Sequence, residues 1–357
     1  MIVHAVTVAL LFGLSFLCTG IFRRHAFQKG LLDVPNDRSS HALPTPRGGG
    51  IVFVVLIVAI WAGILLWQMM NHAYSNPGNG YMFISALLIA ALGFVDDRYQ
   101  LSAKFRLTCQ IIVFSIFLYW LLVGPLLGSL MPHFVNEKAG YLLFVGFSYL
   151  FLIWMTNLYN FMDGIDGIAA AEALFFLLSI TFFYHDRLFF PLAELTWMLC
   201  PLLIGFFVWN FPKAKLFMGD VGSSFLGAFI AMVSLYLATI SWVSFIVCII
   251  LLANFITDAT MTLLRRFYLK EDVFKAHRSH AYQHASRHYK SHIPVTLGVT
   301  AINLVWLFPW AYAVSFGMIN PLLAMSIAYM PIVVLVLYFE GGKKDTLKEE
   351  EMILNSP

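Results

Sequence analysis

The chain has 357 residues, of which 60% are hydrophobic and only 11% are charged. Soluble domains usually carry about a quarter charged residues, so this composition, with a mean hydropathy of +0.80, excludes an ordinary soluble protein and indicates a polytopic membrane protein. The net charge of +3 gives no reason to expect nucleic acid as a partner.

Apolar segments recur along the whole chain. A helix needs about 20 apolar residues to cross a bilayer, and we predict an all-α integral membrane bundle of about eleven spans. Ten is the alternative, because the third segment is short and Pro201 interrupts the seventh. The predicted spans are 2–22, 50–70, 81–95, 106–127, 141–157, 168–184, 192–210, 223–240, 242–263, 294–316 and 320–339.

The basic residues lie unequally between the spans. All 22 Lys and Arg residues except Lys138 and Arg187 fall in alternate connecting segments, as in cytoplasmic loops. We therefore predict a periplasmic N-terminus and a cytoplasmic C-terminus, with one membrane domain, 1–340, and a charged cytoplasmic tail, 341–357. The cytoplasmic segments that carry the polar residues of interest are 23–49, 96–106, 157–167, 211–222 and 264–293.

The loop before the second span contains Pro44-Thr-Pro46-Arg47, followed by three glycines. Prolines and glycines give such a loop a defined, non-helical path. Arg38, His41 and Arg47 are candidate contacts for a lipid phosphate. The glycines alone would also suit a simple entry into the helix.

Two adjacent carboxylates, Asp96 and Asp97, close the third span. Ionisable groups at a membrane boundary are costly, which favours a role in binding metal or phosphate. Neighbouring residues on a helix point about 100° apart, so the two side chains do not meet one ligand in the same way. The alternative is that they pair with the basic residues that follow, Arg98, Lys104 and Arg106.

Two amides and two carboxylates then recur at every third position in Asn157, Asn160, Asp163 and Asp166. Residues at this spacing meet on adjacent helical turns. The glycines after each aspartate predict the end of the helix there. Because a helix C-terminus already carries partial negative charge, carboxylates at that position indicate a compensating cation or donor and therefore a binding site.

Asp220 follows Lys215 and lies between two glycines at the start of the eighth span. The free N–H groups of a helix start accept an oxyanion, and Mg²⁺ prefers one or two carboxylates together with phosphate oxygens. A helix start capped by Asp220 is the alternative.

The inner loop 264–293 gathers histidine and arginine. Its side chains Arg278, His280, Gln283 and His284 suit a diphosphate. A zinc site at His280 and His284 is a weaker reading, and a solvated basic loop is the alternative for any one histidine.

The acidic residues thus collect at one interface, whereas transporters place ionisable groups near the bilayer midplane on opposed broken helices. We expect no such helices in this chain. This favours an enzyme that meets cytoplasmic and lipid substrates over a transporter or flippase, which is the alternative from another class.

Four motifs occur in order along the chain, between residue 31 and about residue 290. They are Pro44-x-Pro46-Arg47-x-Gly49-Gly50, Gly93-x-x-Asp96-Asp97, Asn157-x-x-Asn160-x-x-Asp163-Gly-x-Asp166-Gly167 and Met218-Gly219-Asp220-x-Gly222-Ser223. Together they resemble the polyprenyl-phosphate N-acetylhexosamine-1-phosphate transferases of the WecA, TagO and MraY type. The family's His-x-His-His motif is here His280-Ala-Tyr282-Gln283, which looks like the WbpL and WbcO subgroup that starts O-antigen synthesis.

The resemblance implies transfer of a sugar-1-phosphate from a UDP-N-acetylhexosamine to undecaprenyl phosphate in the bacterial inner membrane, with release of UMP. It implies Mg²⁺ as the cofactor, with Mn²⁺ as the alternative, bound by Asp220 with help from Asp97. Membrane lipids are further partners, and a homodimer is left open. The runner-up within the family is the phospho-N-acetylmuramoyl-pentapeptide transferase of peptidoglycan synthesis.

By the same resemblance, the catalytic residues are Asp96, Asp97 and Asp220. The expected substrate-binding residues are Arg47, Asn157, Asn160, Asp163, Asp166, Lys215, Arg278, His280, Gln283 and His284.

Overall fold

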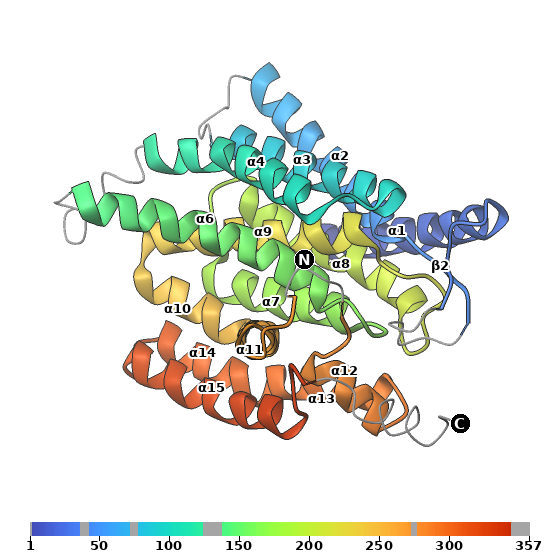
Figure 1. The fold of residues 1–357 in the computed structure, drawn as a ribbon. Helices are drawn as coiled ribbons and strands as arrows, with labels where there is room; N and C mark the ends of the chain where they lie inside the picture. Colours follow the sequence, from blue (N-terminus) through green and yellow to red (C-terminus); the bar gives the residue numbers. More distant parts are fainter. Residues whose placement is uncertain (1, 36–42, 72–77, 124–137, 273–276, 344–357) are drawn as a thin grey trace.

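The computed structural model describes residues 2–35, 43–71, 78–123, 138–272 and 277–343, and shows a bundle of helices (Figure 1). Arg38, His41 and most of the tail 341–357 lie outside the described residues. The helices are α1 (Ile2–Gln28), α2 (Gly50–Met70), α3 (Gly78–Tyr99), α4 (Ala103–Val123), α6 (Lys138–Phe161), α7 (Ile168–Tyr184), α8 (Leu192–Asn210), α9 (Asp220–Ile240), α10 (Trp242–Leu251), α11 (Ala253–Tyr268), α12 (Ala281–His288), α13 (Ile293–Ile302), α14 (Phe308–Ser315) and α15 (Pro321–Tyr338).

Ten helical segments of the described chain are long and apolar enough to cross a membrane, and α10 with α11 would supply an eleventh as one bent pair. This confirms the predicted polytopic helical bundle. Pro201 lies inside α8 without ending it, and α3 is longer than its apolar segment indicated, with 22 residues. The short third segment and Pro201 were the reasons for considering ten spans, and neither of them removes a span.

The ninth predicted span, 242–263, is wrong as a continuous helix. The chain bends by 75° between α10 and α11, and α11 is seen nearly end-on among the other helices (Figure 1). The physical reason lies in α11 itself, which buries polar side chains such as Asp258 and Thr262 on one side and exposes Leu264 and Phe267 on another. Such a helix needs polar partners that lipid does not supply.

A chain of buried polar side chains supports the bend. Asn254, just after it, donates to Asn303 at 2.7 Å, and Asn303 donates to Glu172 of α7 at 2.6 Å. Asn303 opens a π-helical turn, Asn303–Leu307, between α13 and α14. Because unsatisfied polar groups are costly in an apolar interior, these bonds hold three elements together.

The central helix of the bundle is α9, which packs against α2, α3, α6 and α10. It is apolar almost all round, and 89% of its spanning window is buried. Its first residue, Asp220, lies where α3 and α6 end. We call this end of the bundle the polar end.

Close backbone contact fixes α3 against the start of α9. A Cβ atom added at Gly93 would lie only 2.5 Å from the carbonyl oxygen of Asp220. Gly219, the residue before α9, has a φ of +78°, which glycine adopts without strain. Both glycines therefore help to bring Asp96 and Asp97 beside Asp220.

The loop before α2 is paired with the loop before α9. A short antiparallel ladder, β1 (Leu32–Asp33) with β2 (Thr45–Pro46), leads into it. The Phe217 N–H then donates to the Pro46 carbonyl, and the Gly49 and Gly50 N–H groups donate to the carbonyls of Phe217 and Met218, all at 2.8 Å. The proline-glycine motif thus serves to hold the loop that carries Asp220.

We predict that Gly93→Ala destabilises the protein by about 1–3 kcal/mol, because the added methyl group overpacks the α3–α9 contact. Thermal unfolding in detergent would show a lower Tm. Gly146→Ala in α6 is the matched control, since a Cβ atom added there would meet nothing in the described part of the chain within 4 Å. Equal Tm values for the two variants would contradict the close contact.

Candidate active site

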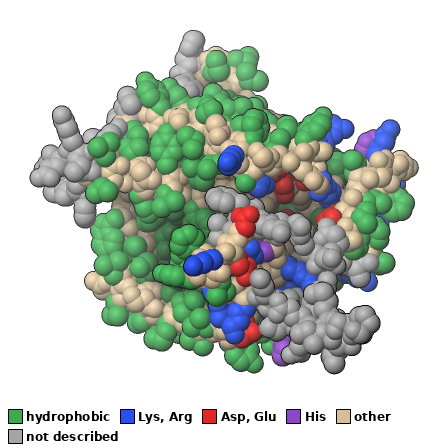
Figure 2. Space-filling view, viewed as in Figure 1, with side chains coloured by type: hydrophobic (Ala, Val, Ile, Leu, Met, Phe, Trp, Pro, Cys, Tyr) green, Lys and Arg blue, Asp and Glu red, His purple; other side chains and the backbone are tan. Residues whose placement is uncertain are grey.

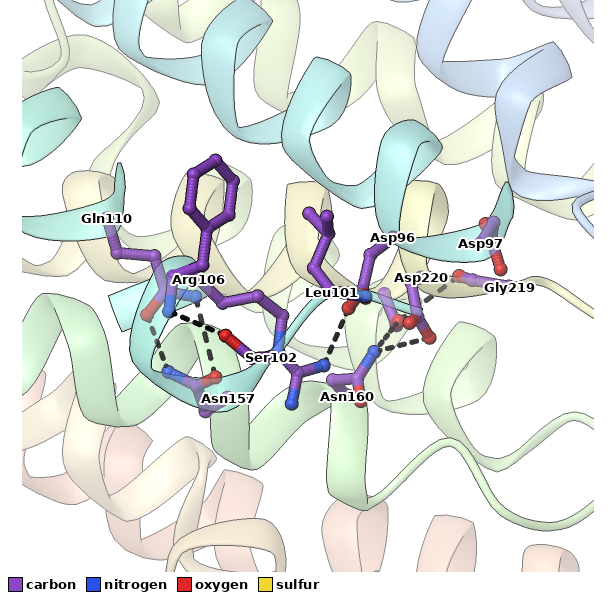
Figure 3. A network of polar contacts seen from close by, with 12 residues as sticks. Asp96, Asp97, Leu101, Ser102, Arg106, Gln110, Asn157, Asn160, Gly219 and Asp220 are labelled. Carbon is purple, nitrogen blue, oxygen red and sulfur yellow. Dashed lines mark hydrogen bonds and ion pairs between the residues drawn. The ribbon is translucent and has the colours of Figure 1, made fainter. Parts of the chain in front are cut away.

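The polar end gathers carboxylates from three segments of the chain. Asp97 lies in the last turn of α3, Asp163 and Asp166 follow α6, and Asp220 begins α9. We call these four residues the carboxylate cluster. Figure 3 shows Asp97 and Asp220 on either side of Gly219. The Val221 N–H donates to Asp97 Oδ2 at 3.1 Å, so the first turn of α9 holds one of its oxygens.

Asp96 and Asp97 have different surroundings. Asp96 is buried, and its two oxygens accept from Arg106 Nη1 at 2.6 Å and from the Leu101 N–H at 2.7 Å (Figure 3). Asp97 is only half-buried, and Arg47 donates to its backbone carbonyl rather than to its carboxylate. Asp96 therefore pairs with a following basic residue, as one of the two predictions proposed. The carboxylate of Asp97 has no such pair among the described residues and is more accessible to a ligand.

Asn160 orients Asp220. Its Nδ2 group donates to Asp220 Oδ1 at 2.8 Å and to Ser223 Oγ at 3.0 Å (Figure 3). Ser223 in turn donates to the Gly219 carbonyl at 3.1 Å. Asn160 therefore fixes one oxygen of Asp220 and ties the start of α9 to the end of α6.

The carboxylate cluster carries more negative charge than its surroundings neutralise. Burial, together with the nearby carboxylates of Asp220, Asp97 and Asp166, raises the pKa of Asp163 well above its ordinary value. Carboxylates that disfavour one another's ionisation in this way are typical of sites that bind cations or exchange protons.

The donor set fits Mg²⁺ better than a transition metal. Among the described residues, no three His, Cys, Asp or Glu side chains form a ready ligand set. Mg²⁺ needs no such set, because it usually binds through one or two carboxylates and completes its shell with water and substrate phosphate. Asp220 is the residue that would hold it, with help from Asp97.

A basic hollow of about 600 Å³ lies on one side of the cluster. Asp166 stands at its wall, where it accepts from the Ala214 N–H at 3.1 Å and pairs with His292 at 3.1 Å. Five further residues make the lining basic and partly aromatic. They are Lys213, Arg278, Arg287, Lys290 and Phe217. Such a lining suits an anion attached to a flat ring.

A side groove of about 630 Å³ lies between α4, α6 and α11. Apolar side chains such as Leu107, Leu150 and Phe267 line part of it, and Leu150 and Phe267 are also exposed on the outside of the bundle. Polar residues line the rest, namely Arg106, Gln110, Asn157, Asn160, His277 and His280. The groove therefore combines an apolar surface that reaches the outside of the bundle with a polar lining. Figure 2 shows charged side chains gathered beside largely hydrophobic surface.

The series Asn157, Asn160, Asp163 and Asp166 is divided between these two spaces. Asn157 and Asn160 line the side groove, and Asp166 lines the basic hollow. The helix ends at Phe161, as the glycines predicted, and Gly167 has a φ of +77°. The three-residue spacing therefore places the first two residues on one helix face, and the turn directs the last one elsewhere.

Other predicted site residues have mainly structural contacts. Gln283 is buried and accepts from the His280 N–H at 3.2 Å, and the ammonium group of Lys215 lies over the ring of Trp209. Lys215 and His284 are not among the residues that line the two spaces. Arg47, Arg278 and His280 do lie beside the cluster, the basic hollow and the side groove, respectively.

Two residues of the site, Gln110 and Asn210, carried no clear signal in the sequence. Gln110 and Asn157 exchange hydrogen bonds across the side groove, with the shorter at 2.8 Å. Asn210 accepts from the Gly167 N–H at 2.9 Å and donates to the Leu216 carbonyl, which joins the loops that carry Asp166 and Asp220. The one sign of them in the sequence was a polar side chain within an otherwise apolar segment.

Comparison with known proteins identifies the class. Residues 80–238 match the family model described as Glycosyl transferase family 4. A probable undecaprenyl-phosphate N-acetylglucosaminyl 1-phosphate transferase of Bacillus subtilis is 28% identical over 294 residues, which cover 81% of this chain and 79% of that protein. The matched part of the chain, residues 80–238, is of the glycosyl transferase family 4 type, and the resemblance drawn from the four motifs is confirmed at the level of the family.

Two further relatives match shorter parts. A decaprenyl-phosphate N-acetylglucosaminephosphotransferase of Mycobacterium tuberculosis is 28% identical over 62% of this chain and 57% of its own length. A phospho-N-acetylmuramoyl-pentapeptide-transferase of Streptococcus agalactiae is 34% identical over 54% of this chain and 60% of its own length. Both matches span less than two thirds of the relative. The likeness to the WbpL and WbcO subgroup stays a prediction.

We predict that Asp163→Asn raises the Tm in EDTA more at pH 8 than at pH 5. A raised pKa means that the folded protein favours the protonated carboxyl, so ionisation costs stability as the pH rises through the folded pKa. Asparagine removes that cost, and a gain of about 1 kcal/mol corresponds to about 2–4 °C in a large domain. Melting curves at the two pH values test this. An equal shift at both would contradict the raised pKa.

Proposed function

We propose that the protein transfers a sugar-1-phosphate from a UDP-N-acetylhexosamine to undecaprenyl phosphate and releases UMP. The observation that carries the proposal is the position of the carboxylate cluster between two unlike spaces. Asn160 in the side groove binds Asp220, and Asp166 at the basic hollow is close enough to act on Asp163. A water-soluble donor and a lipid acceptor could therefore reach the same carboxylates from different sides.

The basic hollow is the proposed donor site. Its arginine and lysine side chains would bind the diphosphate, since planar guanidinium groups match phosphate oxygens. The ring of Phe217 offers a surface for the uracil base. The loop that carries Phe217 is fixed by its hydrogen bonds to Pro46 and Gly49, which favours a preformed site.

The side groove is the proposed acceptor site. An isoprenoid chain would lie against the apolar residues of α4, α6 and α11, which reach the outside of the bundle. Its phosphate would lie near Arg106, Asn157 and His280. Arg106 is also bound to Asp96, so Asp96 would position the arginine rather than react itself.

Transfer of a phosphoryl group is mainly a matter of positioning and charge neutralisation. A phosphate monoester titrates near pH 6, so the acceptor is largely dianionic at neutral pH and needs little help from a base. We therefore favour direct attack, with Asp97 positioning the acceptor and Asp220, held by Asn160, on the donor side. Bound Mg²⁺ would neutralise charge on the donor phosphates. A covalent phospho-aspartate route is the alternative.

The proposed setting is the cytoplasmic face of a bacterial inner membrane, at the first step of O-antigen synthesis. The distribution of basic residues supports the orientation. The replacement of two histidines of the family motif by Tyr282 and Gln283 supports the O-antigen step over the peptidoglycan step. The donors to compare are the UDP forms of GlcNAc, FucNAc and QuiNAc.

The decisive experiment is a donor panel with the purified protein, undecaprenyl phosphate and Mg²⁺. Release of UMP with one of the three UDP-N-acetylhexosamines, together with a lipid-linked sugar diphosphate, is the expected result. Turnover only with UDP-N-acetylmuramoyl-pentapeptide would instead assign the peptidoglycan step. No UMP from any donor would refute the enzyme proposal and leave the transporter reading.

We predict that Asp97→Asn lowers kcat by about 10²-fold or more, a loss typical of removing a group that acts in the reaction. The affinity for UDP-sugar measured without Mg²⁺ should change by less than about 3-fold, because Asp97 is assigned to the acceptor and not to direct contact with the donor. Isothermal titration and steady-state rates separate the two effects. Equal losses of binding and turnover would contradict the assignment. Asp96→Asn should lower the Tm and raise the KM for undecaprenyl phosphate, since it breaks a partly buried pair with Arg106, which is assigned to the acceptor.

We predict that Asp220→Asn loses activity that added Mg²⁺ does not fully restore. Asn160→Ala should act more mildly and raise the Mg²⁺ concentration needed for half-maximal rate by about 10–100-fold, because it removes only the residue that orients Asp220. Mg²⁺ titrations of the rate test both variants. Unchanged Mg²⁺ dependence in Asn160→Ala would contradict the assigned metal site.

A further inference from the structure

Asp258 of α11 is buried in the protein, and its carboxylate faces the start of α12. Its Oδ1 accepts from the Ala281 N–H and its Oδ2 from the Tyr282 N–H, both at 2.9 Å. These are the first two N–H groups of α12, which have no partner within their own helix. A carboxylate at this position also matches the partial positive charge of the helix start. Asp258 therefore fixes α12 against α11.

The same carboxylate meets the ring of His280. Nδ1 of His280 lies 3.4 Å from Asp258 Oδ1. The ring itself lines the side groove, although the residue as a whole is only 2% exposed. At this distance the two groups are in contact, and Nδ1 makes no aligned hydrogen bond with any described residue. Asp258 is thus placed to bind one ring nitrogen while the ring lies at the groove.

Neighbouring groups restrict the His280 ring from other sides. The ring of His277 stacks on it at 4.9 Å, and Phe161 of α6 lies at 6.3 Å. Burial and the nearby charges of His280 and Arg266 lower the pKa of His277 to about 3, so His277 is uncharged. Tyr282 donates to the Phe161 carbonyl at 2.8 Å and ties α12 to the end of α6.

We propose that Asp258 is a positioning residue for the transfer reaction. Its carboxylate faces the Nδ1–H group of His280 and so orients the ring to donate from Nε2–H to the phosphate in the side groove. The proposal rests on the proposed function, because it takes the groove as the acceptor site. A carboxylate that binds one nitrogen of a histidine generally fixes the tautomer and orientation of the ring.

The first test does not depend on activity. Hydrogen–deuterium exchange of the peptide 277–284 should become at least about 10-fold faster at the amides of Ala281 and Tyr282 in Asp258→Asn. The asparagine NH₂ group cannot accept the second N–H. The matched control is Thr257→Val at the adjacent residue. The buried hydroxyl of Thr257 has no hydrogen-bond partner among the described residues, so this change should leave exchange unchanged. Unchanged protection in Asp258→Asn would overturn the proposal.

The second test is a double-mutant cycle on the reaction. Asp258→Asn and His280→Gln should each lower kcat by about 10²-fold, with the KM for UDP-sugar changed by less than about 3-fold. The double variant should be no more than about 3-fold slower than His280→Gln, because Asp258 acts through His280. Multiplied losses, or an active Asp258→Asn, would overturn the proposal. Thr257→Val should keep the rate of the unchanged protein.

A third measurement covers the case in which Asp258→Asn does not fold. In the unchanged protein with ¹⁵N-labelled histidine, NMR should show His280 protonated at Nδ1, with its signal assigned by its loss in His280→Gln. A His280 ring without a proton at Nδ1 would overturn the proposal. If no UDP-sugar gives UMP, the proposed function fails, and the exchange and NMR results still decide whether Asp258 holds α12 and His280.

Discussion

The packing of α3 and α6 against the start of α9 brings like charges together, and the rest of the polar end is arranged around this cost. Burial and the nearby carboxylates of Asp220 and Asp97 raise the pKa of Asp163. Backbone N–H groups and Asn160 compensate part of the charge. A protein that needed only stability would not keep these carboxylates together, because apolar residues would pack there without repulsion. The arrangement therefore favours ligand binding over stability.

The membrane bundle could be predicted from the sequence because each span is an almost uninterrupted apolar segment of about 20 residues. The bend before α11 could not. The polar side chains of α11 find partners in Asn303 and in α12, which lie 49 and 23 residues further along the chain. Hydropathy detects the apolar character of a segment but gives no sign of such distant partners.

The candidate site was predictable in its residue types and less so in its geometry. Asp96 and Asp97 had two open readings. The structure supports pairing with a following basic residue for Asp96, because the chain turns after α3 and brings Arg106 back to it. A role of Asp97 in binding metal or phosphate stays a prediction. The regular spacing from Asn157 to Asp166 suggested one surface. The series instead divides between two different spaces, because the helix ends at Phe161 and helical spacing no longer places the later residues on the same face.

The side groove has exposed apolar residues of α6 and α11 along its edge, so it is open towards the space that lipid would fill. A substrate that enters from there does not pass through water, and its supply depends on diffusion within the plane of the bilayer. For such an enzyme the concentration that matters is the mole fraction of the acceptor among the lipids. Under the proposed function, diluting the acceptor with inert lipid should therefore slow the reaction even when its amount per volume is constant.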